Sequence, residues 1–362
     1  MIRLHKISLT QYKNYSFSSF EFKERVTGIC GLNGRGKTNL LDAIYYCCFT
    51  KSYFSRNDLH NVQFDREGFR LESHFELGGK QHNLTCINRG QGKKELLMNG
   101  VAYEKFSQHI GKFPVVMVAP DDIDLIRGNS EERRSFMDTV LCQMDGDYLQ
   151  HLIVYNKVLL QRNSLLKQFA ELGKTDIQLL EVIDGQLVIP GNQIYTKRKL
   201  FTAKFIPLVQ KIYGQIAGNE EIINLQYLSG LNENEMAVLL KLTREKDLIL
   251  QRTGAGIHRD EIEFQLNDQP FKTTASQGQR KSLLFALKLA EFEILKENKG
   301  YAPLLMLDDV FEKLDDGRMQ QLLQCVCKEN DGQVFITDTH RERLEETFGS
   351  LGVGYGVVEL DN

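Results

Sequence analysis

Alternating and wholly apolar stretches recur along the first 118 residues of the chain, interrupted by one helical segment that runs to about Cys48. Apolar residues at every second position are typical of half-buried strands, and short apolar runs are typical of fully buried ones. Asn99-Gly100 lies between two such stretches and is a strong hairpin signal. The expected strands are Ile2–Leu9, Ser16–Phe22, Val26–Cys30, Phe69–Leu77, Asn83–Asn88, Glu95–Met98 and Phe113–Val118. This pattern predicts an antiparallel β patch.

Helical spacing of the apolar residues replaces this pattern from Asp121 to about Ala217, with Gly218 as a natural stop. One apolar stripe consists of Tyr148, Leu149, Leu152, Tyr155, Val158 and Leu159. A second stripe begins at Ile183 and is broken at Pro190-Gly191. Such stripes are typical of a core or of a helix–helix contact, so we assign no cofactor to them.

Strands and helices alternate again in the last third of the chain. The expected strands are Asp260–Leu266, Leu304–Leu307, Gln333–Thr337 and Val353–Glu359, and a long helix is expected at Gln277–Lys296. A chain of 362 residues exceeds the length at which a single core stops growing. We therefore expect one α/β lobe, formed by residues 1–118 with 300–362, and a mainly helical second lobe, formed by residues 119–299.

Composition excludes several classes of protein. The net charge is −3, so the chain lacks the overall basic character of many nucleic-acid-binding proteins. No apolar run approaches the roughly 20 residues of a membrane span, and the N-terminus has no signal-peptide pattern. The seven cysteines include no C-x-x-C pair. They are typical of reduced, packed thiols in a cytoplasmic protein and do not favour a zinc site.

A glycine-rich loop stands between a buried strand and a helix. Residues 31–38 match G-x-x-x-x-G-K-[ST], the phosphate-binding P-loop, and the flanking strand and helix are the context that the motif requires. Glycines let backbone N–H groups turn toward phosphate oxygens, and the helix N-terminus adds positive charge. The candidate nucleotide-binding residues are Gly31, Leu32, Asn33, Gly34, Arg35, Gly36, Lys37, Thr38 and Asn39. Lys37 is expected to reach the β- and γ-phosphates, and Thr38 to bind Mg²⁺.

The apolar strand Leu304–Leu307 runs into Asp308-Asp309, a Walker B pattern. Asp308 is the second candidate ligand of Mg²⁺, and Asp309 is the candidate base that orients or deprotonates the attacking water. Two aspartates that merely cap the next element are the alternative. Lys37 and Asp308 lie about 270 residues apart, so a long insertion separates the two motifs.

A second candidate anion site opens the long helix before Walker B. Ser276, Gln277 and Gly278 have the position and form of an ABC-type signature, which offers a hydroxyl and free N–H groups at a helix N-terminus. An ordinary serine N-cap is the alternative. After Walker B, Phe311–Asp315 stands in the D-loop position, and His340 follows a strand where ABC ATPases place a switch histidine. For His340, a merely solvated loop histidine is the alternative.

These motifs together resemble the RecF family of DNA-repair ATPases, in the SMC-like branch of ABC ATPases. The resemblance covers essentially the whole chain. It is most specific at Asn14-Tyr15, Ala119–Asp122, Gly128, Glu132–Asp138, Tyr155–Asn163 and Gly256–Asp260. The family usually has Pro where this chain has Ile257, and Asp where it has Glu261. The Q-loop glutamine of other ABC ATPases has no clear counterpart, since Asp121 or Asp122 occupies that region.

The resemblance implies both a fold and a function. The fold is an ABC-type P-loop ATPase head, with a mixed sheet and an antiparallel β patch, and a helical lobe without a long coiled coil. The implied protein is cytoplasmic, binds ATP with Mg²⁺, dimerises on ATP and is a weak, DNA-stimulated ATPase. It binds duplex DNA and single-strand/duplex junctions at gaps. With RecR and RecO it helps to load RecA in repair, replication restart and the SOS response.

Two other functions remain open at this point. A nucleotide-binding subunit of an ABC transporter needs the same ATP motifs, but with a shorter spacing and a membrane partner. A P-loop kinase for a small molecule does not account for the signature. For DNA binding, the candidate basic residues are Arg133, Arg134, Lys197, Arg198 and Lys199, although such runs are often solvated helix faces.

Overall fold

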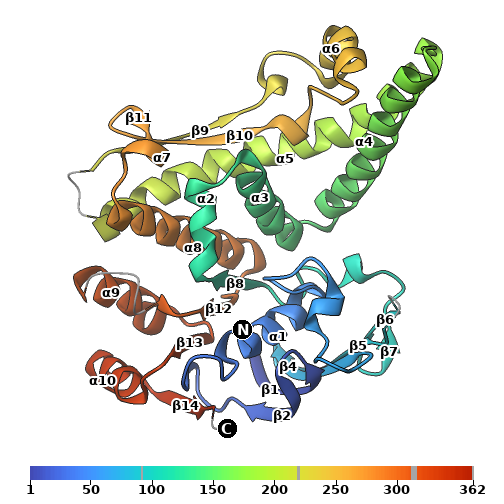
Figure 1. The fold of residues 1–362 in the computed structure, drawn as a ribbon. Helices are drawn as coiled ribbons and strands as arrows, with labels where there is room; N and C mark the ends of the chain where they lie inside the picture. Colours follow the sequence, from blue (N-terminus) through green and yellow to red (C-terminus); the bar gives the residue numbers. More distant parts are fainter. Residues whose placement is uncertain (91–92, 218–220, 311–315, 361–362) are drawn as a thin grey trace. The chain divides into compact units, whose positions relative to one another are not determined.

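The computed structural model describes residues 1–90, 93–217, 221–310 and 316–360 (Figure 1). The chain divides into two compact units. Unit 1 comprises Met1–Ile123, Gln215–Gly218 and Ser276–Asn362, and unit 2 comprises Asp124–Gly214 and Asn219–Ala275. The expected α/β class is confirmed, because unit 1 combines two sheets with helices.

A five-stranded parallel sheet forms the centre of unit 1. Its order is β14 (Tyr355–Glu359), β3 (Val26–Cys30), β13 (Val334–Asp338), β12 (Leu304–Leu307) and β8 (Val115–Val118). Every residue of β3, β8, β12 and β13 is buried. Parallel strands are usually covered on both faces, which explains why these segments are short apolar runs without alternation.

A six-stranded antiparallel sheet is the second layer of unit 1. Its order is β2 (Tyr15–Glu21), β1 (Ile2–Tyr12), β4 (Phe69–Leu77), β5 (Lys80–Asn88), β6 (Lys94–Met98) and β7 (Val101–Ala102). The expected hairpin is confirmed between β6 and β7, where Asn99 and Gly100 have φ angles of 52° and 81°. Two consecutive positive φ angles are what a type I′ turn requires.

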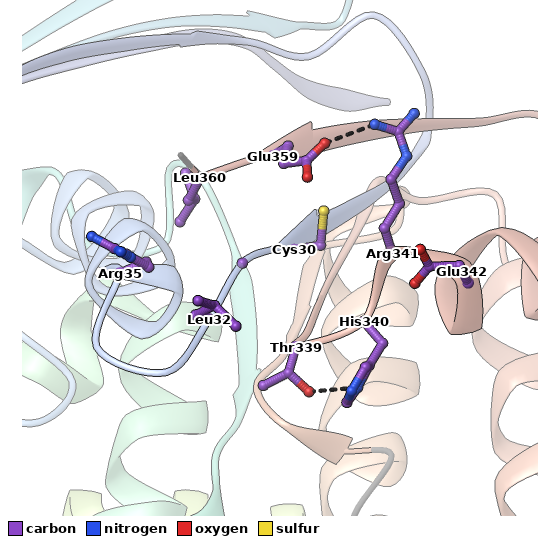
Figure 2. A pocket seen from close by; sticks show the side chains of 10 residues that line it. Cys30, Leu32, Arg35, Thr339, His340, Arg341, Glu342, Glu359 and Leu360 are labelled. Atoms are coloured by element: carbon purple, nitrogen blue, oxygen red, sulfur yellow. Dashed lines mark hydrogen bonds and ion pairs between the residues drawn. The ribbon is translucent and has the colours of Figure 1, made fainter. Parts of the chain in front are cut away.

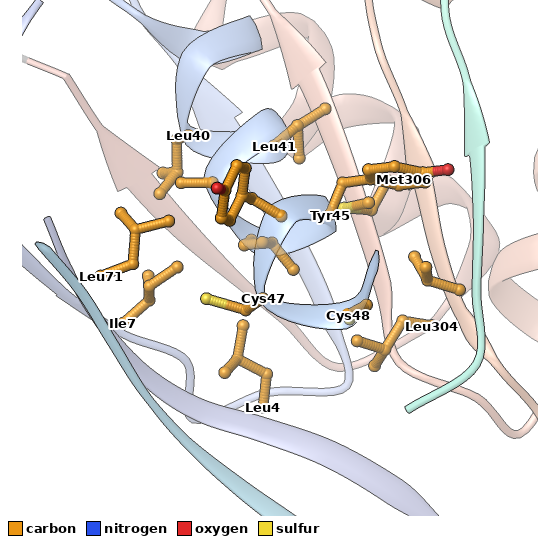
Figure 3. Packing of buried hydrophobic residues seen from close by; sticks show 14 of the residues in the cluster. Leu4, Ile7, Leu40, Leu41, Tyr45, Cys47, Cys48, Leu71, Leu304 and Met306 are labelled. Carbon is orange, nitrogen blue, oxygen red and sulfur yellow. The ribbon is translucent and has the colours of Figure 1, made fainter. Parts of the chain in front are cut away.

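Helix α1 (Lys37–Phe49) contacts strands of both sheets. Nearly all its residues are buried, so it has no polar face. In Figure 3, Leu4, Ile7 and Leu71 of the antiparallel sheet lie on one side of α1, and Leu304 and Met306 of the parallel sheet lie on the other. This sandwich fixes the helix that follows the P-loop, and with it the position of the loop.

Further helices complete unit 1. They are η1 (Asp58–Asn61), η2 (Phe106–Gln108), η3 (Pro120–Ile123), α8 (Gln277–Lys299), α9 (Asp316–Leu323), η7 (Gln324–Glu329) and α10 (Arg341–Leu351). Helix α10 contacts β3, β13 and β14, whereas α8 contacts β8 and η3. The sequence-based boundary put residues 276–299 in the helical lobe, but in the structure α8 lies within unit 1. The seven cysteines are free thiols and six are buried, as expected.

Unit 2 is mainly helical. Its helices are α2 (Asp124–Arg127), α3 (Ser130–Met144), α4 (Gly146–Leu172), α5 (Ile177–Ala217), η4 (Gly230–Asn232), α6 (Met236–Leu250), η5 (Ile257–Arg259) and α7 (Phe271–Thr274). A three-stranded antiparallel sheet accompanies them, in the order β11 (Gln269–Pro270), β10 (Glu261–Leu266) and β9 (Ile223–Leu228). Strand β9 was not expected from the sequence.

The prediction that the helix breaks at Pro190-Gly191 is wrong, because α5 continues through Pro190 and Pro207. Leu187 and Ile194 on either side of Pro190 are fully buried. Packing of this face therefore outweighs the backbone hydrogen bond that a proline removes. Gly218, the expected stop of the helix, lies outside the described residues.

Candidate nucleotide-binding site

The parallel sheet brings the motifs of the two ends of the chain together. Strand β13 lies between β3 and β12 and is parallel to both. The carboxyl ends of the three strands therefore share one edge, where open α/β sheets bind ligands. The P-loop follows β3, Asp308-Asp309 follows β12, and His340 follows β13. The long insertion between the motifs leaves this neighbourhood intact.

The P-loop has the backbone of an anion cradle. Gly34 and Gly36 have φ angles of 83° and 103°, in the left-handed region that favours glycine. Gly36 is the N-cap of α1 and provides no side-chain cap, so the N–H groups of the first turn remain available to an anion. The Lys37 ammonium donates to the carbonyl oxygens of Gly31 at 2.7 Å and Leu32 at 3.4 Å, which holds it inside the loop.

Asp308 lies in contact with the P-loop helix. The Thr38 hydroxyl donates to Asp308 Oδ2 at 2.8 Å, and the Thr337 hydroxyl donates to Asp308 Oδ1 at 2.8 Å. Burial raises the pKa of Asp308, although both hydroxyls oppose this shift by stabilising the carboxylate. The expected pair of Mg²⁺ ligands, Thr38 and Asp308, is therefore in direct contact.

These two oxygen ligands fit Mg²⁺. Mg²⁺ is commonly held by one or two carboxylates together with substrate phosphates and water, and not by an all-protein cage. Within the described ranges, no group of three or more His, Cys, Asp or Glu side chains is arranged to hold a metal. The donor set at Thr38 and Asp308 is thus one that a bound nucleotide would complete.

Asp309 has a strained backbone. Its φ angle is 47°, which is uncommon for a residue other than glycine, and its N–H donates to the Thr337 hydroxyl at 2.8 Å. Strain of this kind gathers at functional sites, where the surrounding structure holds it. Thr337 thus fixes both Walker B residues, although it belongs to neither of the sequence motifs. The D-loop, expected at Phe311–Asp315, lies outside the described residues.

The loop after β13 faces the P-loop across a pocket of about 520 Å³. Figure 2 shows Leu32 and Arg35 of the P-loop on one side, with Thr339 and His340 on the other. His340 is exposed, and its Nδ1 lies 2.8 Å from the Thr339 hydroxyl. The buried Asp338 accepts from the His340 backbone N–H at 2.8 Å and from Arg343 at 2.6 Å. The histidine loop is therefore anchored, and the exposed ring of His340, held by Thr339, lines the pocket.

Ser276 caps α8. Its hydroxyl accepts from the Gln279 N–H at 3.2 Å, and the Gln279 side chain accepts from the Ser276 N–H at 2.7 Å, which is a capping box. The capping alternative is therefore realised in the structure. A cap does not exclude a signature, because the N–H groups of Gln277 and Gly278 still lie at a helix N-terminus. The signature role of Ser276, Gln277 and Gly278 stays a prediction.

Asp122, in the Q-loop region, belongs to a buried polar cluster of unit 1. It accepts hydrogen bonds from the Tyr53 hydroxyl and, at 2.8 Å, from the Ala119 N–H. The ammonium of Lys288, on α8, lies 3.3 Å from the Asp122 carboxylate and donates to the Tyr53 hydroxyl at 3.0 Å. Asp122 thus joins α8 to the segment after β8 and is not a free substitute for the Q-loop glutamine.

The structure corrects the list of basic residues proposed for DNA. Arg198 is fully buried and pairs with Asp138 at 2.8 Å and Asp260 at 2.7 Å, so it cannot contact DNA. Arg133 is half-buried and bonded to Glu261. The exposed members of the set are Lys197 and Lys199.

The sequence of this chain is similar to those of known proteins along nearly its whole length. A family model described as an AAA domain matches residues 6–324. The DNA replication and repair protein RecF of Flavobacterium johnsoniae is 43% identical over 360 residues, which cover 99% of this chain and 100% of that protein. The protein of the same name from Parabacteroides distasonis is 40% identical over 358 residues, covering 99% of this chain and 97% of that protein.

Solved structures give the same result. The recombination mediator protein RecF–ATP in the RecFOR pathway aligns with a TM-score of 0.87 and 31% identity, covering 94% of this chain and 92% of that chain. The Smc head domain from Pyrococcus furiosus aligns with a TM-score of 0.55 and 14% identity, covering 97% of this chain and 92% of that chain, which shows a shared fold alone. These likenesses confirm the expected ABC-type ATPase fold.

Proposed function

This chain belongs to the RecF family of DNA replication and repair proteins, and we propose that it is an ATP-dependent DNA-binding repair protein that dimerises on ATP. The observation that carries the proposal is the contact of Thr38 with Asp308, which joins the P-loop to Walker B at one sheet edge. The RecF–ATP neighbour supports ATP as the nucleotide. Membership of this family excludes the two alternatives, a transporter subunit and a small-molecule kinase.

Each residue of the site has one proposed task. Backbone N–H groups of the P-loop and the Lys37 ammonium bind the phosphates, and Thr38 with Asp308 holds Mg²⁺. The metal, when bound, neutralises charge that develops on the phosphates. Asp309 orients or deprotonates the attacking water, and His340 meets the γ-phosphate from the loop after β13.

ATP is proposed to be shared by two chains. Ser276, Gln277 and Gly278 of one chain complete the nucleotide site of the other, in a homodimer with two-fold symmetry. ADP lacks the γ-phosphate and releases the dimer, which makes hydrolysis a switch. The proposed activity is a weak, DNA-stimulated ATPase in the cytoplasm. None of the helices in the described part of the chain has the length and apolar character needed to cross a membrane.

The proposed substrate is DNA with a gap or a single-strand/duplex junction. We further propose that the protein acts with RecR and RecO to help load RecA in repair, replication restart and the SOS response. The RecFOR pathway named for the RecF–ATP neighbour supports this placement. With a net charge of −3, one chain has no overall excess of positive charge, so DNA binding is proposed to depend on two chains acting together.

A DNA titration with and without ATP tests this function. Fluorescence anisotropy of a labelled gapped duplex is expected to report tighter binding with ATP. The plot of log K against log salt falls by about 0.9 for each phosphate contact, so its slope should be steeper with ATP. Lys37→Ala is the matched control, because it should remove the effect of ATP. Equal affinity and equal slope with and without ATP contradict the proposal.

A further inference from the structure

The tip of the β1–β2 hairpin lies directly against the outside of the P-loop. Asn14 Nδ2 donates to the Arg35 carbonyl oxygen at 3.2 Å, and the Tyr15 hydroxyl donates to the Gly36 carbonyl oxygen at 3.0 Å. Two consecutive peptide units of the P-loop are therefore held by hydrogen bonds from a different strand pair. None of the motif residues provides these bonds.

These two bonds orient the groups that face the nucleotide. In a planar trans peptide the C=O and the following N–H point in opposite directions. A donor that holds the Arg35 carbonyl on the hairpin side thus directs the Gly36 N–H to the opposite side. The Gly36 carbonyl also accepts from the Leu40 N–H at 2.8 Å, so Tyr15 and the helix together direct the N–H of Lys37. N–H groups fixed in this way form an anion-binding concavity.

The hairpin approaches so closely that residue 36 has no room for a side chain. A Cβ atom at Gly36 would lie 2.6 Å from Asn14 Nδ2 and 2.8 Å from the Tyr15 hydroxyl. Asn39, in the first turn of α1, donates to Asn14 Oδ1 at 2.7 Å. The Asn14 amide is therefore bonded on both sides, which fixes its orientation and links the loop to the first turn of the helix.

The hairpin is itself fastened to α1. The Tyr12 hydroxyl donates to the buried carboxylate of Asp42 at 2.7 Å, and the Lys13 ammonium lies 2.5 Å from the same carboxylate. Lys13 adopts a φ angle of 49°, and its N–H donates to the Asn61 carbonyl oxygen at 2.9 Å. The tip is thus held in its strained conformation independently of any ligand.

We propose that Asn14 and Tyr15 are positioning residues for phosphate binding, which hold the P-loop N–H groups in their binding orientation before the nucleotide arrives. The inference rests on the proposed binding of ATP. A loop that is preorganised loses less freedom on binding, so the gain appears as affinity for the nucleotide. Asn14 and Tyr15 contact backbone carbonyl groups, and neither is proposed as a catalytic residue.

Nucleotide binding and protein stability are measured on the same variants. Asn14→Ala and Tyr15→Phe are each expected to weaken the binding of fluorescent ATP and ADP by about three- to ten-fold, the range that one net hydrogen bond gives. KM for ATP should rise while kcat stays near the wild-type value, because Asp308 and Asp309 are unchanged. The nucleotide-free variants should stay folded, with a Tm lower by only about a few degrees, which is what the loss of one hydrogen bond costs.

Two further variants sharpen the experiment. Asn14→Asp keeps the shape and the acceptor for Asn39 but loses the donor to Arg35, so it should weaken binding at least as much as Asn14→Ala. Ser18→Ala is the matched control, because Ser18 lies on β2 and its hydroxyl donates to the adjacent Phe17 carbonyl oxygen. It should leave both affinities unchanged.

The outcomes separate this inference from the proposed function. If the wild type binds neither nucleotide, the proposed function itself fails. If the wild type binds nucleotide and both Asn14 variants bind it with the wild-type affinity, the positioning role is refuted. A variant that binds weakly because it is already partly unfolded at the assay temperature also refutes it, because the hairpin would then support only the fold.

Discussion

Asp308 and Asp309 are neighbours with different surroundings. Asp308 is buried and accepts hydroxyl hydrogen bonds from two elements, whereas Asp309 has a positive φ angle and is bonded through its backbone N–H. The first arrangement suits a group that stays in place on a metal. In the second, the bond that holds Asp309 uses its backbone N–H and not its carboxylate, which is why we assign the two residues different tasks.

Asp309→Asn tests this division of tasks. The amide keeps the size of the side chain and the backbone bond to Thr337, so ATP binding should stay at the wild-type level. Hydrolysis should slow by at least about 100-fold, because the amide is not a base. Rates of phosphate release and nucleotide titrations measure both effects. Hydrolysis at the wild-type rate means that Asp309 is only a turn residue.

The sequence was sufficient to predict those functional residues that belong to short, local motifs. Lys37, Thr38 and Asp308 were identified because the P-loop and Walker B patterns are local, and the structure brings all three to one edge. The burial of Arg198 was not predictable in this way. Its partners Asp138 and Asp260 lie about 60 residues away on either side, so only the folded chain reveals that this arginine is a core residue.

At the scale of elements, the strands of the parallel sheet were predicted best. Val26–Cys30 and Leu304–Leu307 match β3 and β12, because short apolar runs have one stable solution inside an α/β layer. Strand β9 was missed although Ile223, Leu225 and Tyr227 alternate with polar residues, as in a half-buried strand. The contact of the hairpin tip with the P-loop was also missed, although Asn14-Tyr15 was noted.

Helix α8 and the segment after β8 meet at a carboxyl group that titrates near neutral pH. Burial raises the pKa of Glu291 from 4.5 to about 7, Lys288 opposes this rise and Asp122 adds to it. The folded chain therefore keeps a proton that the unfolded chain releases between about pH 4.5 and 7. Stability falls as pH rises through this range, because the folded state binds more protons.

Glu291→Gln is expected to remove the loss of stability that accompanies the rise in pH. The amide cannot ionise, so the variant should gain stability relative to the wild type as pH rises from 4.5 to 8, by on the order of 1–3 kcal/mol. Urea unfolding at several pH values measures the difference. Glu293→Gln, at an exposed position of the same helix, is the matched control. A difference between Glu291→Gln and wild type that does not change with pH contradicts the shifted pKa.

The two units of the molecule contain different features. Unit 1 contains the P-loop, Walker B, the histidine loop and Ser276, whereas unit 2 is held by buried arginine–carboxylate pairs. Two helix N-termini in one unit do not easily reach the same γ-phosphate from opposite sides. A second copy of the chain would resolve this difficulty, which is why the proposed function includes a homodimer with shared nucleotide sites.

Mixing two defective variants tests whether two chains share each nucleotide site. Lys37→Ala cannot hold the phosphates, while Ser276→Asp keeps a good N-cap on α8 but puts a negative charge where the partner's γ-phosphate would lie. Light scattering with ATP should find each variant alone as a monomer. A mixed dimer has one site with both lesions and one site with neither. The mixture should therefore form some dimer and recover up to half of the wild-type ATPase activity. Ser276→Asp alone dimerising on ATP like the wild type, or a mixture that stays monomeric, would contradict the shared site.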